Sequence, residues 1–470
     1  MRVLVVQPPL FVHREHIDYP AFVSLAAWTV AAHLRAAGID VELADAFLMD
    51  GADFHAGEPY STLGSPPEKF WAELQRRRFA AAVVHLDPFT VQAPDDGWLG
   101  PTFAALRAAN PGAPIVLADL HIGGMNYVDY DPSHYVNRPD GADYLLRFEG
   151  EASLAAFAQA LARGEEPPWP RGAAVVGEAL AAPLPAYGGC LYENVDLAAY
   201  GRFLARWLER NPRPNVFAVT AGTVPFKASR GCCFACRFCT SRLAEGYGQR
   251  AGWRPVETEG LAATVAALGR RPGVDKLFVL DEAANVAAAH FEALLDAAEA
   301  ASLKLEFPNG LRADRLTEPM IARLAGLISV LSLSPESGAQ SVVDRLMGKH
   351  QDLAAVERAA AAAKRRALPV VLHFLIGWPG ETKRETVETI ALARRLWEEY
   401  GAEPWVQFVV PMPGTALFET CRAKGLLPDP LPRDYGPAFQ GGPLLRDGAC
   451  ELKNADLVRL RDALAAAVRR

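Results

Sequence analysis

Four of the seven cysteines of this chain lie in the eight-residue segment from Cys232 to Cys239. Cys232, Cys236 and Cys239 have the spacing Cys-x-x-x-Cys-x-x-Cys, which suits three thiolates of one loop that converge on a single inorganic cluster. Three ligands do not close such a site, so a cluster of four irons would keep one iron available to bind and reduce another molecule. The spacing therefore predicts an iron–sulfur centre with an open coordination position.

A structural zinc site and a redox disulfide are the alternative interpretations of these cysteines. Zinc requires a fourth Cys or His at finger-like spacing, and after Cys239 the next histidine is His290. A disulfide explains two of the cysteines and leaves two unused. The three remaining cysteines are dispersed, as buried apolar cysteines are: Cys190, Cys421 and Cys450. We therefore favour the cluster and interpret Cys233 as a packing residue.

The residues around the cysteines resemble the signature of the radical SAM superfamily. Ser229-Arg230-Gly231 precedes the first cysteine and Phe238 precedes the last, whereas Cys233 stands where Pro is usual. The resemblance implies that the thiolates are the metal ligands and catalytic residues that hold a 4Fe-4S cluster: Cys232, Cys236 and Cys239. It also implies that the cluster binds S-adenosylmethionine (SAM) and cleaves it reductively to a 5′-deoxyadenosyl radical, which abstracts a hydrogen atom from a substrate.

Composition is compatible with a cytoplasmic enzyme of several domains. The 470 residues are 50% hydrophobic and 22% charged, which is typical of a compact soluble protein. The formal charge of −7 argues against a nucleic-acid partner, which usually requires basic patches. We expect no signal sequence and no membrane span, because the apolar runs are shorter than the ~18 residues a span needs. Cysteines concentrated in one motif indicate a reducing compartment.

The first 180 residues alternate strands and helices. Strands are predicted at 2–6, 41–45, 81–86 and 114–118, and a helix at 24–37. This alternation predicts βαβ units and a doubly wound parallel sheet, which is a Rossmann-like α/β fold. Ligands of such sheets bind beyond the carboxyl ends of the strands, so the loops of interest are 8–16, 87–94 and 119–130.

This region resembles the cobalamin-binding domain that precedes the radical SAM core in one large subgroup. The matching pieces are Leu25-Ala26-Ala27 with Leu34, Asp45, Asp143-Tyr144-Leu145-Leu146-Arg147 and Glu149-Gly150-Glu151. Ala118-Asp119 stands where many members have Gly-Gly for the cofactor's nucleotide tail, and Phe148 stands where another Gly is frequent. No Asp-x-His-x-x-Gly motif follows the first strand, so no lower axial histidine is assigned there. The lone His121, in the later loop Asp119-Leu120-His121-Ile122-Gly123-Gly124, is more typical of a hydrogen-bonding residue or a substrate contact than of a cobalt ligand. The sequence therefore leaves open whether the protein binds cobalamin.

The alternation resumes at residue 226, after a linker at 181–225 with one helix at 200–209. Strands are predicted at 226–230, 276–280, 304–307, 330–334, 370–375 and 405–410. Helices are predicted at 256–268, 290–301, 318–324, 355–366 and 383–399. Six strands are too few for an eight-stranded barrel and fit the partial (β/α)6 TIM barrel of the radical SAM family, over 226–425. A small tail at 426–470 carries a last helix at 455–468.

Polar residues follow five of these strands, and the resemblance assigns several of them to cofactor binding. It implies that Phe238 packs on the adenine of SAM and that Gly377 admits the adenosine. The remaining assignments concern polar contacts with SAM: Asp281 and Glu282 near its amino group, Arg312 at its carboxylate, and Ser334 and Glu336 at its ribose or methionine part. A salt bridge at the strand end is the alternative role for Glu336 and for Arg312.

Three functional hypotheses are compatible with the sequence. The first is a radical SAM enzyme of natural-product biosynthesis that acts on a small molecule, with cobalamin-dependent C-methylation as the leading reaction. The second keeps the radical chemistry without cobalamin and performs a deoxygenation, dehydration, cyclisation or rearrangement. The third is an iron–sulfur redox sensor without catalytic activity. An enzyme of this kind needs an external electron donor of the flavodoxin or ferredoxin type, and we expect neither nucleic acid nor membrane as a partner.

Overall fold

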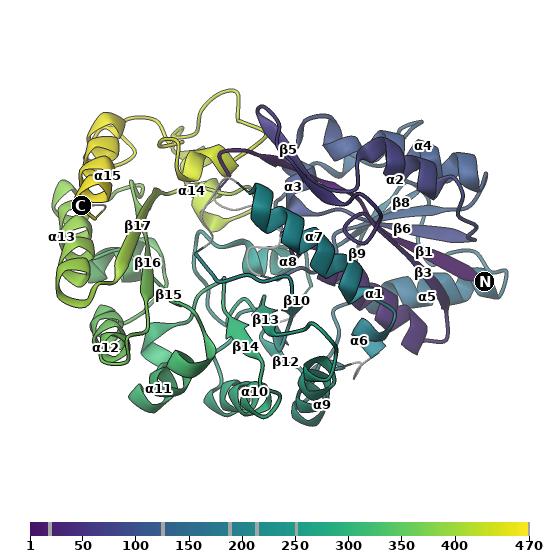
Figure 1. The fold of residues 1–470 in the computed structure, drawn as a ribbon. Helices are drawn as coiled ribbons and strands as arrows, with labels where there is room; N and C mark the ends of the chain where they lie inside the picture. The colour runs from purple at the N-terminus through teal and green to yellow at the C-terminus, as the bar shows by residue number, and fades with distance from the viewer. Residues whose placement is uncertain (17–20, 124–126, 187–189, 212–215, 250–251, 469–470) are drawn as a thin grey trace.

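The computed structural model describes residues 1–470 except 17–20, 124–126, 187–189, 212–215, 250–251 and 469–470. The chain forms two α/β halves that lie side by side, and both contribute to one continuous hydrophobic core (Figure 1). Phe22 of the first half stacks on Phe278 of the second, with ring centroids 4.1 Å apart. The junction between the halves is therefore closely packed.

The N-terminal half is built on a six-stranded sheet that is parallel throughout, in the order β3-β1-β6-β7-β8-β9. Its strands are β1 (Arg2–Gln7), β3 (Asp40–Asp45), β6 (Ala81–His85), β7 (Ile115–Ala118), β8 (Tyr144–Arg147) and β9 (Ala174–Val176). Helices α1 (Ser24–Ala36) and α5 (Glu151–Ala162) cover one face, and α2 (Pro67–Leu74) and α4 (Leu99–Ala109) cover the other (Figure 1). The predicted doubly wound sheet is confirmed.

The sequence pattern does not reveal two parts of this half. The last two strands, β8 and β9, have only four and three residues, and the apolar run of β9 is too short to indicate a strand. A separate antiparallel sheet consists of β2 (Leu10–His13), β5 (Tyr60–Gly64) and β4 (Asp53–His55). It begins directly after Pro8-Pro9, where the sequence predicts that the chain leaves the sheet.

The second half is an open, partial barrel of six parallel strands, as predicted. The strands form two sheets of three, β10-β13-β14 and β15-β16-β17. A parallel bridge between Leu311 and Leu333 connects the two sheets. The strands are β10 (Thr223–Phe226), β13 (Lys276–Val279), β14 (Lys304–Glu306), β15 (Leu331–Glu336), β16 (Val370–Ile376) and β17 (Glu403–Phe408). The helices on the outside are α9 (Thr258–Gly269), α10 (Ala288–Ala300), α11 (Glu318–Leu327), α12 (Leu353–Lys364) and α13 (Lys383–Tyr400).

The start of the barrel differs from the prediction. The prediction of one strand at 226–230 is wrong. β10 ends at Phe226, and two residues separate it from β11 (Ser229–Arg230). β11 pairs with β12 (Arg254–Pro255) in an antiparallel ribbon that is not part of the barrel. The chain thus turns away from the barrel wall just before the cysteines.

The linker and the tail both pack against neighbouring elements. Helix α7 (Leu197–Arg210) lies on the N-terminal half, where Phe203 meets Phe47 with ring centroids 4.9 Å apart. Helix α15 (Asn454–Val468) lies beside α13 and β17, and its Leu457 is buried against Phe408. The remaining short helices are α3 (Pro88–Gln92), α6 (Cys190–Glu193), α8 (Leu243–Gly246) and α14 (Ala416–Ala423).

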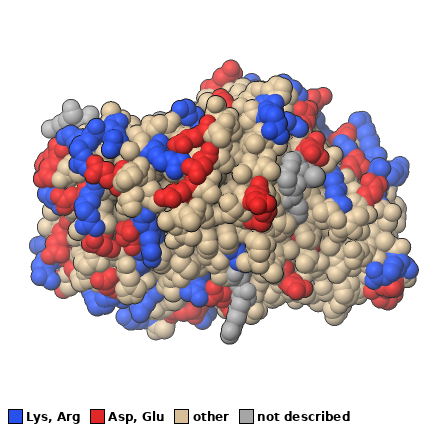
Figure 2. Space-filling view, turned by 90° about the horizontal axis from the view of Figure 1, so that it is seen from below, with Lys and Arg blue, Asp and Glu red and all other residues tan. Residues whose placement is uncertain are grey.

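The charged side chains are unevenly distributed over the surface. Seen from below, Lys and Arg are interspersed with Asp and Glu on the side of the barrel's outer helices, and the centre of this face carries few charges (Figure 2). A search of the described helices for one with the length and apolarity of a membrane span finds none.

Candidate active site

The three cysteines of the motif lie in one loop after β11 and line one cavity. This cavity, of about 220 Å³, is bounded by Cys232, Cys236 and Cys239 together with strand-end residues of the barrel. Gly231 begins the loop with a φ of 79°, and a Cβ on it would lie 1.9 Å from the carbonyl oxygen of Gly252. Only glycine therefore allows the loop to turn at this point.

The chemistry of the thiols fits a metal cluster. Burial raises the pKa of Cys232 to about 12 and that of Cys236 to about 11, so these thiols keep their protons until a metal replaces them. Among the described residues, no three His, Cys, Asp or Glu side chains converge closely enough to hold one metal ion. A four-iron cluster does not need that convergence, because each thiolate binds a different iron. Cys233 is exposed, and its interpretation as a packing residue is wrong.

Most of the residues that the sequence assigns to SAM also line this cavity. They are Phe238, Glu282, Arg312, Ser334 and Glu336. Phe238 comes from the cysteine loop itself and packs edge-on against Trp378, with ring centroids 5.3 Å apart. The other four follow or end strands β13, β14 and β15, so the carboxyl ends of three barrel strands meet the cysteine loop here.

Asp281 and Gly377 do not belong to the lining of the cavity. The carboxylate of Asp281 accepts hydrogen bonds from the Ala228 N–H, at 2.8 Å, and from the hydroxyl of Ser229. It thus holds the strand that leads into the cysteine loop. A Cβ on Gly377 would lie 3.0 Å from Leu457, so this glycine faces α15.

Glu336 is held by a lysine that the sequence pattern does not single out. Nζ of Lys349 lies 2.8 Å from Oε1 of Glu336 and also donates to the carbonyl oxygen of Ser334. Glu336 is 7% exposed and has a φ of 64°, a conformation that costs a non-glycine residue energy and is common at functional sites. The salt bridge that we considered for Glu336 is therefore present, and it lies on the cavity wall.

Arg312 is likewise engaged by its own surroundings. Its Nε and one terminal nitrogen lie 2.9 and 2.8 Å from the two carboxylate oxygens of Asp314. The guanidinium lies over the ring of Phe234, 3.8 Å from the centroid. The bidentate face that the sequence assigns to the SAM carboxylate is thus paired with Asp314 in this structure.

Two further residues line the cavity, although the sequence assigns neither of them to SAM. Gln351 is 1% exposed, and its Nε2 has no hydrogen-bond partner among the described residues although Gln351 lines the cavity. A buried amide without a partner is costly, so a ligand in the cavity that accepts its hydrogen bond is favoured. Asn309 donates from Nδ2 to the carbonyl oxygens of Leu280 and Asp281, each at 3.0 Å. Gln351 and Lys349 follow a short π-helix (Val342–Leu346), where no regular pattern places them.

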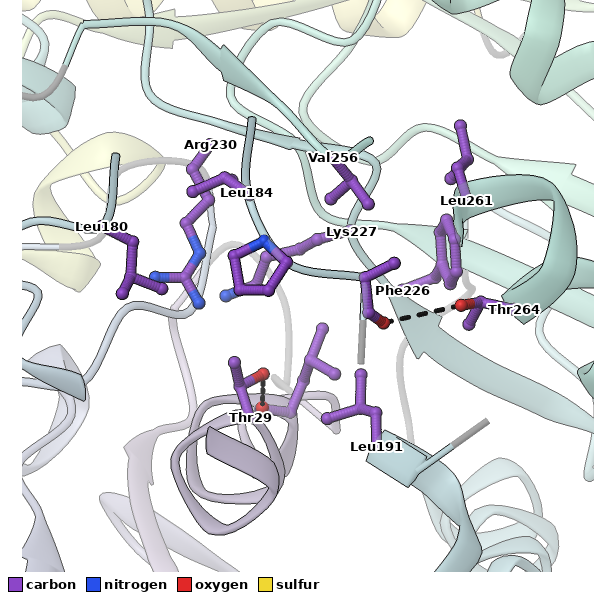
Figure 3. Close-up of a pocket in the computed structure, with 13 residues that line it drawn as sticks. Thr29, Leu180, Leu184, Leu191, Phe226, Lys227, Arg230, Val256, Leu261 and Thr264 are labelled. Carbon is purple, nitrogen blue, oxygen red and sulfur yellow. Dashed lines mark hydrogen bonds between the residues drawn. The ribbon is translucent and has the colours of Figure 1, made fainter. Parts of the chain in front are cut away.

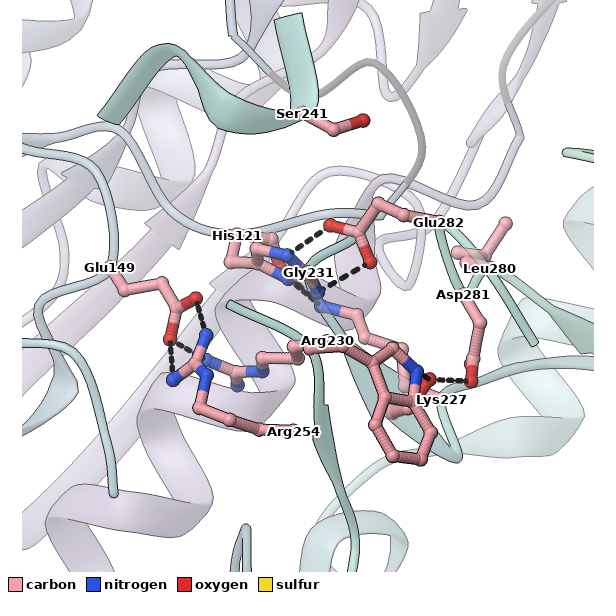
Figure 4. Close-up of polar contacts among 12 residues, drawn as sticks. His121, Glu149, Lys227, Arg230, Gly231, Ser241, Arg254, Leu280, Asp281 and Glu282 are labelled. Carbon is pink, nitrogen blue, oxygen red and sulfur yellow. Dashed lines mark hydrogen bonds and ion pairs between the residues drawn. The ribbon is translucent and has the colours of Figure 1, made fainter. Parts of the chain in front are cut away.

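A network of buried charged groups joins the two halves beside this cavity (Figure 4). Nε2 of His121 lies 2.6 Å from Oε1 of Glu282, and Nδ1 lies 2.9 Å from Nζ of Lys227. Both ring nitrogens of His121 are engaged, so it is a hydrogen-bonding residue rather than a cobalt ligand. Although burial opposes the ionisation of Glu282, its interactions with His121 and Lys227 lower the pKa of this carboxyl.

The carboxyl edge of the N-terminal sheet is filled by side chains at the position where glycine would admit a nucleotide tail. The hydroxyl of Tyr130 donates to Oδ1 of Asp119 at 2.9 Å, and Nε of Arg147 lies 3.5 Å from Oδ2. The guanidinium of Arg147 lies 4.4 to 4.7 Å from the ring centroids of Tyr130, Phe148 and Tyr247. A nucleotide tail at this point does not fit while the pair of Asp119 and Arg147 stays in place.

Comparison with known proteins agrees with both halves of the fold. Residues 226–393 match the sequence model of the radical SAM superfamily. The "Uncharacterized methyltransferase PH0819" of Pyrococcus horikoshii is 28% identical over 217 residues, which are 44% of this chain. The chain thus spans 44% of the length of this curated relative.

Two solved structures share the fold over nearly the whole chain. TsrM of Kitasatospora setae, a radical SAM methyltransferase with cobalamin and a [4Fe-4S] cluster bound, matches with a TM-score of 0.60 and 16% identity over 91% of this chain and 79% of its own. OxsB, a cobalamin-dependent SAM radical enzyme with aqua-cobalamin bound, matches with a TM-score of 0.61 and 13% identity over 93% of this chain and 64% of its own. Residues 226–393 are therefore a radical SAM domain, and the chain as a whole shares the fold of these two structures, in which the N-terminal sheet comes before the barrel.

Proposed function

We propose that this protein is a radical SAM enzyme that removes a hydrogen atom from a small-molecule substrate. The observation that carries the proposal is the single cavity in which three thiols meet polar residues from the carboxyl ends of three barrel strands. The family uses a four-iron cluster and SAM, and the cluster, when bound, supplies the electron that cleaves the sulfonium. An external protein of the flavodoxin or ferredoxin type would deliver that electron.

The chain's own residues would hold and orient the cofactors. Cys232, Cys236 and Cys239 would bind three irons, and the buried amide of Gln351 would donate to a polar group of SAM. Lys349 keeps the carboxylate of Glu336 in place on the same wall. Close packing of the N-terminal half over the barrel would keep water from the radical, which otherwise reacts with whatever it meets.

We further propose that the reaction is methyl transfer with cobalamin as the second cofactor. The support is the shared fold with TsrM and OxsB, which bind cobalamin, together with the relative that is named a methyltransferase. One SAM would supply the methyl group and leave S-adenosylhomocysteine, and a second would become 5′-deoxyadenosine.

A radical reaction without cobalamin is the second candidate, and the pair of Asp119 and Arg147 favours it. This buried pair occupies the position where glycine would make room for the nucleotide tail. In that case the N-terminal half would serve as a lid over the substrate, and the outcome would be a deoxygenation, dehydration, cyclisation or rearrangement.

Reconstitution with hydroxocobalamin separates the two candidates. After anaerobic reconstitution of the cluster and desalting, we expect one corrin per chain in the visible spectrum. With reductant and SAM, S-adenosylhomocysteine should then appear beside 5′-deoxyadenosine. A protein that emerges with iron–sulfur absorption alone rejects methyl transfer through cobalamin. If Asp119→Gly alone retains corrin, the side chain of Asp119 excludes it from the native protein.

A further inference from the structure

The cysteine loop is anchored at its base to the N-terminal half through Arg230, two residues before the first thiol. Its two terminal nitrogens lie 3.1 Å from Oε2 of Glu149 and 2.7 Å from Oε1 of Glu151. All three side chains are at most 5% exposed, so solvent and salt screen these contacts little. Arg254 of β12 also donates to Glu149 (Figure 4). The first anchor is thus a buried group of charges that crosses between the halves.

A second anchor reaches the backbone of the loop itself. The N–H of Gly231, next to Cys232, donates to Oε2 of Glu282 at 3.0 Å. The other oxygen of Glu282 lies 2.6 Å from Nε2 of His121, which belongs to the N-terminal half. A protonated Lys227 can only donate to Nδ1 of His121, which leaves the ring hydrogen on Nε2, where it donates to Glu282. A chain of hydrogen bonds therefore runs from the N-terminal half to the residue that precedes the first thiol.

Lys227 also lines a small cavity behind the network. This cavity, of about 40 Å³, is lined mainly by apolar residues, with Lys227 and Arg230 at one side and Thr29 of α1 at the other (Figure 3). Its volume admits about one water molecule and no organic ligand. Burial in these surroundings lowers the pKa of Lys227 to about 7. The cavity is therefore part of the anchor rather than a binding site.

The loop that carries His121 sits directly on the barrel. A Cβ on Gly123 would lie 2.0 Å from the carbonyl oxygen of Leu280, and Gly123 has a φ of 125°. Leu280 is two residues before Glu282, so the contact fixes His121 and Glu282 relative to each other. The contact needs glycine both for the close approach and for the backbone conformation.

We propose that the N-terminal domain positions the cysteine loop through these two anchors, with His121, Glu149 and Glu151 as positioning residues that act through Glu282 and Arg230. None of the five side chains is a ligand in this assignment. They fix the backbone at Arg230 and Gly231 and thereby the orientation of the Cys232 side chain toward the cluster site. Residues that orient the ligands in this way tune a metal site without binding the metal. The inference rests on a cluster at the three cysteines and is independent of whether the reaction is methyl transfer.

Two substitutions of His121 test the second anchor in the full-length protein. The amide nitrogen of Gln reaches about as far as Nε2, so His121→Gln keeps a donor for Glu282. The shorter Asn does not reach, so His121→Asn breaks the chain while it keeps a polar side chain. His85→Asn is the matched control, because His85 is a fully buried histidine of the same half whose Nδ1 lies 2.7 Å from Oε1 of Gln7.

The readouts are the iron and sulfide content after reconstitution, the electron paramagnetic resonance spectrum of the reduced cluster with and without SAM, and the release of 5′-deoxyadenosine. We expect His121→Asn to change the spectrum and to slow 5′-deoxyadenosine release about 10- to 100-fold. His121→Gln should restore both, and His85→Asn should leave both unchanged even where it lowers the unfolding temperature.

The proposal fails if His121→Asn has the spectrum and the release rate of the unchanged protein. It also fails if His85→Asn alters the cluster as much as His121→Asn does, because the effect would then be one of general destabilisation. If His121→Asn does not fold, Glu151→Ala replaces it, since that variant removes the acceptor for Arg230 at the first anchor. An unchanged spectrum in Glu151→Ala would then overturn the proposal. If the protein without any substitution binds no iron, the proposed function itself is rejected.

Discussion

The N-terminal sheet and the barrel both carry polar residues at the carboxyl ends of their strands, yet the three thiols of the motif lie only at the end of the barrel. At the edge of the barrel, three thiols and the unpartnered amide of Gln351 face a cavity of about 220 Å³. At the edge of the N-terminal sheet, Asp45 accepts hydrogen bonds from Ser24 and Trp28, and Asp119 pairs with Arg147. A polar residue at a strand end, such as Asp45, is therefore not by itself evidence of a ligand.

The difference arises from the segment that comes after each strand. Asp87 lies just beyond β6 and caps α3, where its Oδ1 accepts from the N–H groups of Phe89 and Thr90, each at 2.9 Å. A carboxylate that caps a helix has used its acceptors and has none to offer a ligand. Gly231 instead starts a nine-residue loop that holds all three thiols of the motif. The barrel edge thus adds three thiols to polar groups such as Glu336, which Lys349 already holds, whereas the acids Asp45 and Asp87 of the N-terminal edge are held by their own surroundings.

Removing one thiol from the barrel edge should have the largest effect. Cys236→Ala leaves two thiolates for four irons, so we expect loss of the cluster and of 5′-deoxyadenosine release together. Iron and sulfide analysis after anaerobic reconstitution measures this. Cys233→Ala is the matched control, because Cys233 is exposed in the same loop and should keep about four irons per chain. Unchanged iron and sulfide in a triple alanine variant of the motif would refute the cluster assignment.

Breaking the buried pair at the N-terminal edge should lower stability by the next largest amount. Arg147→Met leaves Asp119 buried without its charged partner, which we expect to cost about 3 kcal/mol of unfolding free energy. Urea titration followed by fluorescence measures the loss. Arg163→Met provides the comparison, since Arg163 and Glu165 are 57% and 54% exposed and their pair should contribute less than about 1 kcal/mol. Equal losses in the two variants would show that burial does not set the strength of the Arg147 pair.

The sequence predicts the chemistry of the barrel edge better than the direction of each side chain. The three cysteines are recognisable because their spacing alone brings them together. Asp281 and Glu282 are adjacent at one strand end, and adjacent residues point to opposite sides, so sequence reasoning assigns both to SAM while the structure turns Asp281 to Ser229. Nothing local decides which of the two faces the cavity.

Contacts between distant segments are the part that the sequence does not reveal. Lys349 reaches Glu336 from the irregular segment that follows the π-helix Val342–Leu346. Gly377 is turned to α15, and no pattern in the sequence places this last helix on the barrel. The salt bridge of Arg312 is a local contact, because its partner Asp314 is only two residues away. A salt bridge could therefore be named from the sequence as the alternative role of Arg312. The longer strands, by contrast, are predictable because apolar runs of strand length alternate with helical segments. A strand such as β9, which is short and not buried, is not predictable in this way.

Glu336 offers a smaller test of the barrel edge. If its carboxylate contacts SAM, Glu336→Gln should weaken SAM binding by about 1 to 3 kcal/mol, because a charged hydrogen bond becomes a neutral one. Isothermal titration calorimetry under anaerobic conditions measures the affinity. Glu336→Gln also leaves Lys349 without its counter-charge, so the unfolding free energy must be measured in parallel. Reduced stability with unchanged SAM affinity would assign Glu336 to the salt bridge alone.

The smallest expected effect concerns a histidine inside the barrel. His373 of β16 lies 3.2 Å from the hydroxyl of Ser332, and burial lowers its pKa from 6.5 to about 4. The folded protein therefore keeps His373 neutral between pH 6.5 and 4, where the unfolded chain takes up a proton. Because the unfolded state binds more protons in this window, stability must fall as pH falls through it, by about 1.5 kcal/mol between pH 6.5 and 5 for this residue. His373→Asn, which cannot titrate, should remove that part of the acid dependence in urea titrations at both pH values. If the variant loses as much stability as the unchanged protein over the same pH range, the protonation of His373 does not contribute to the acid dependence of the unfolding free energy.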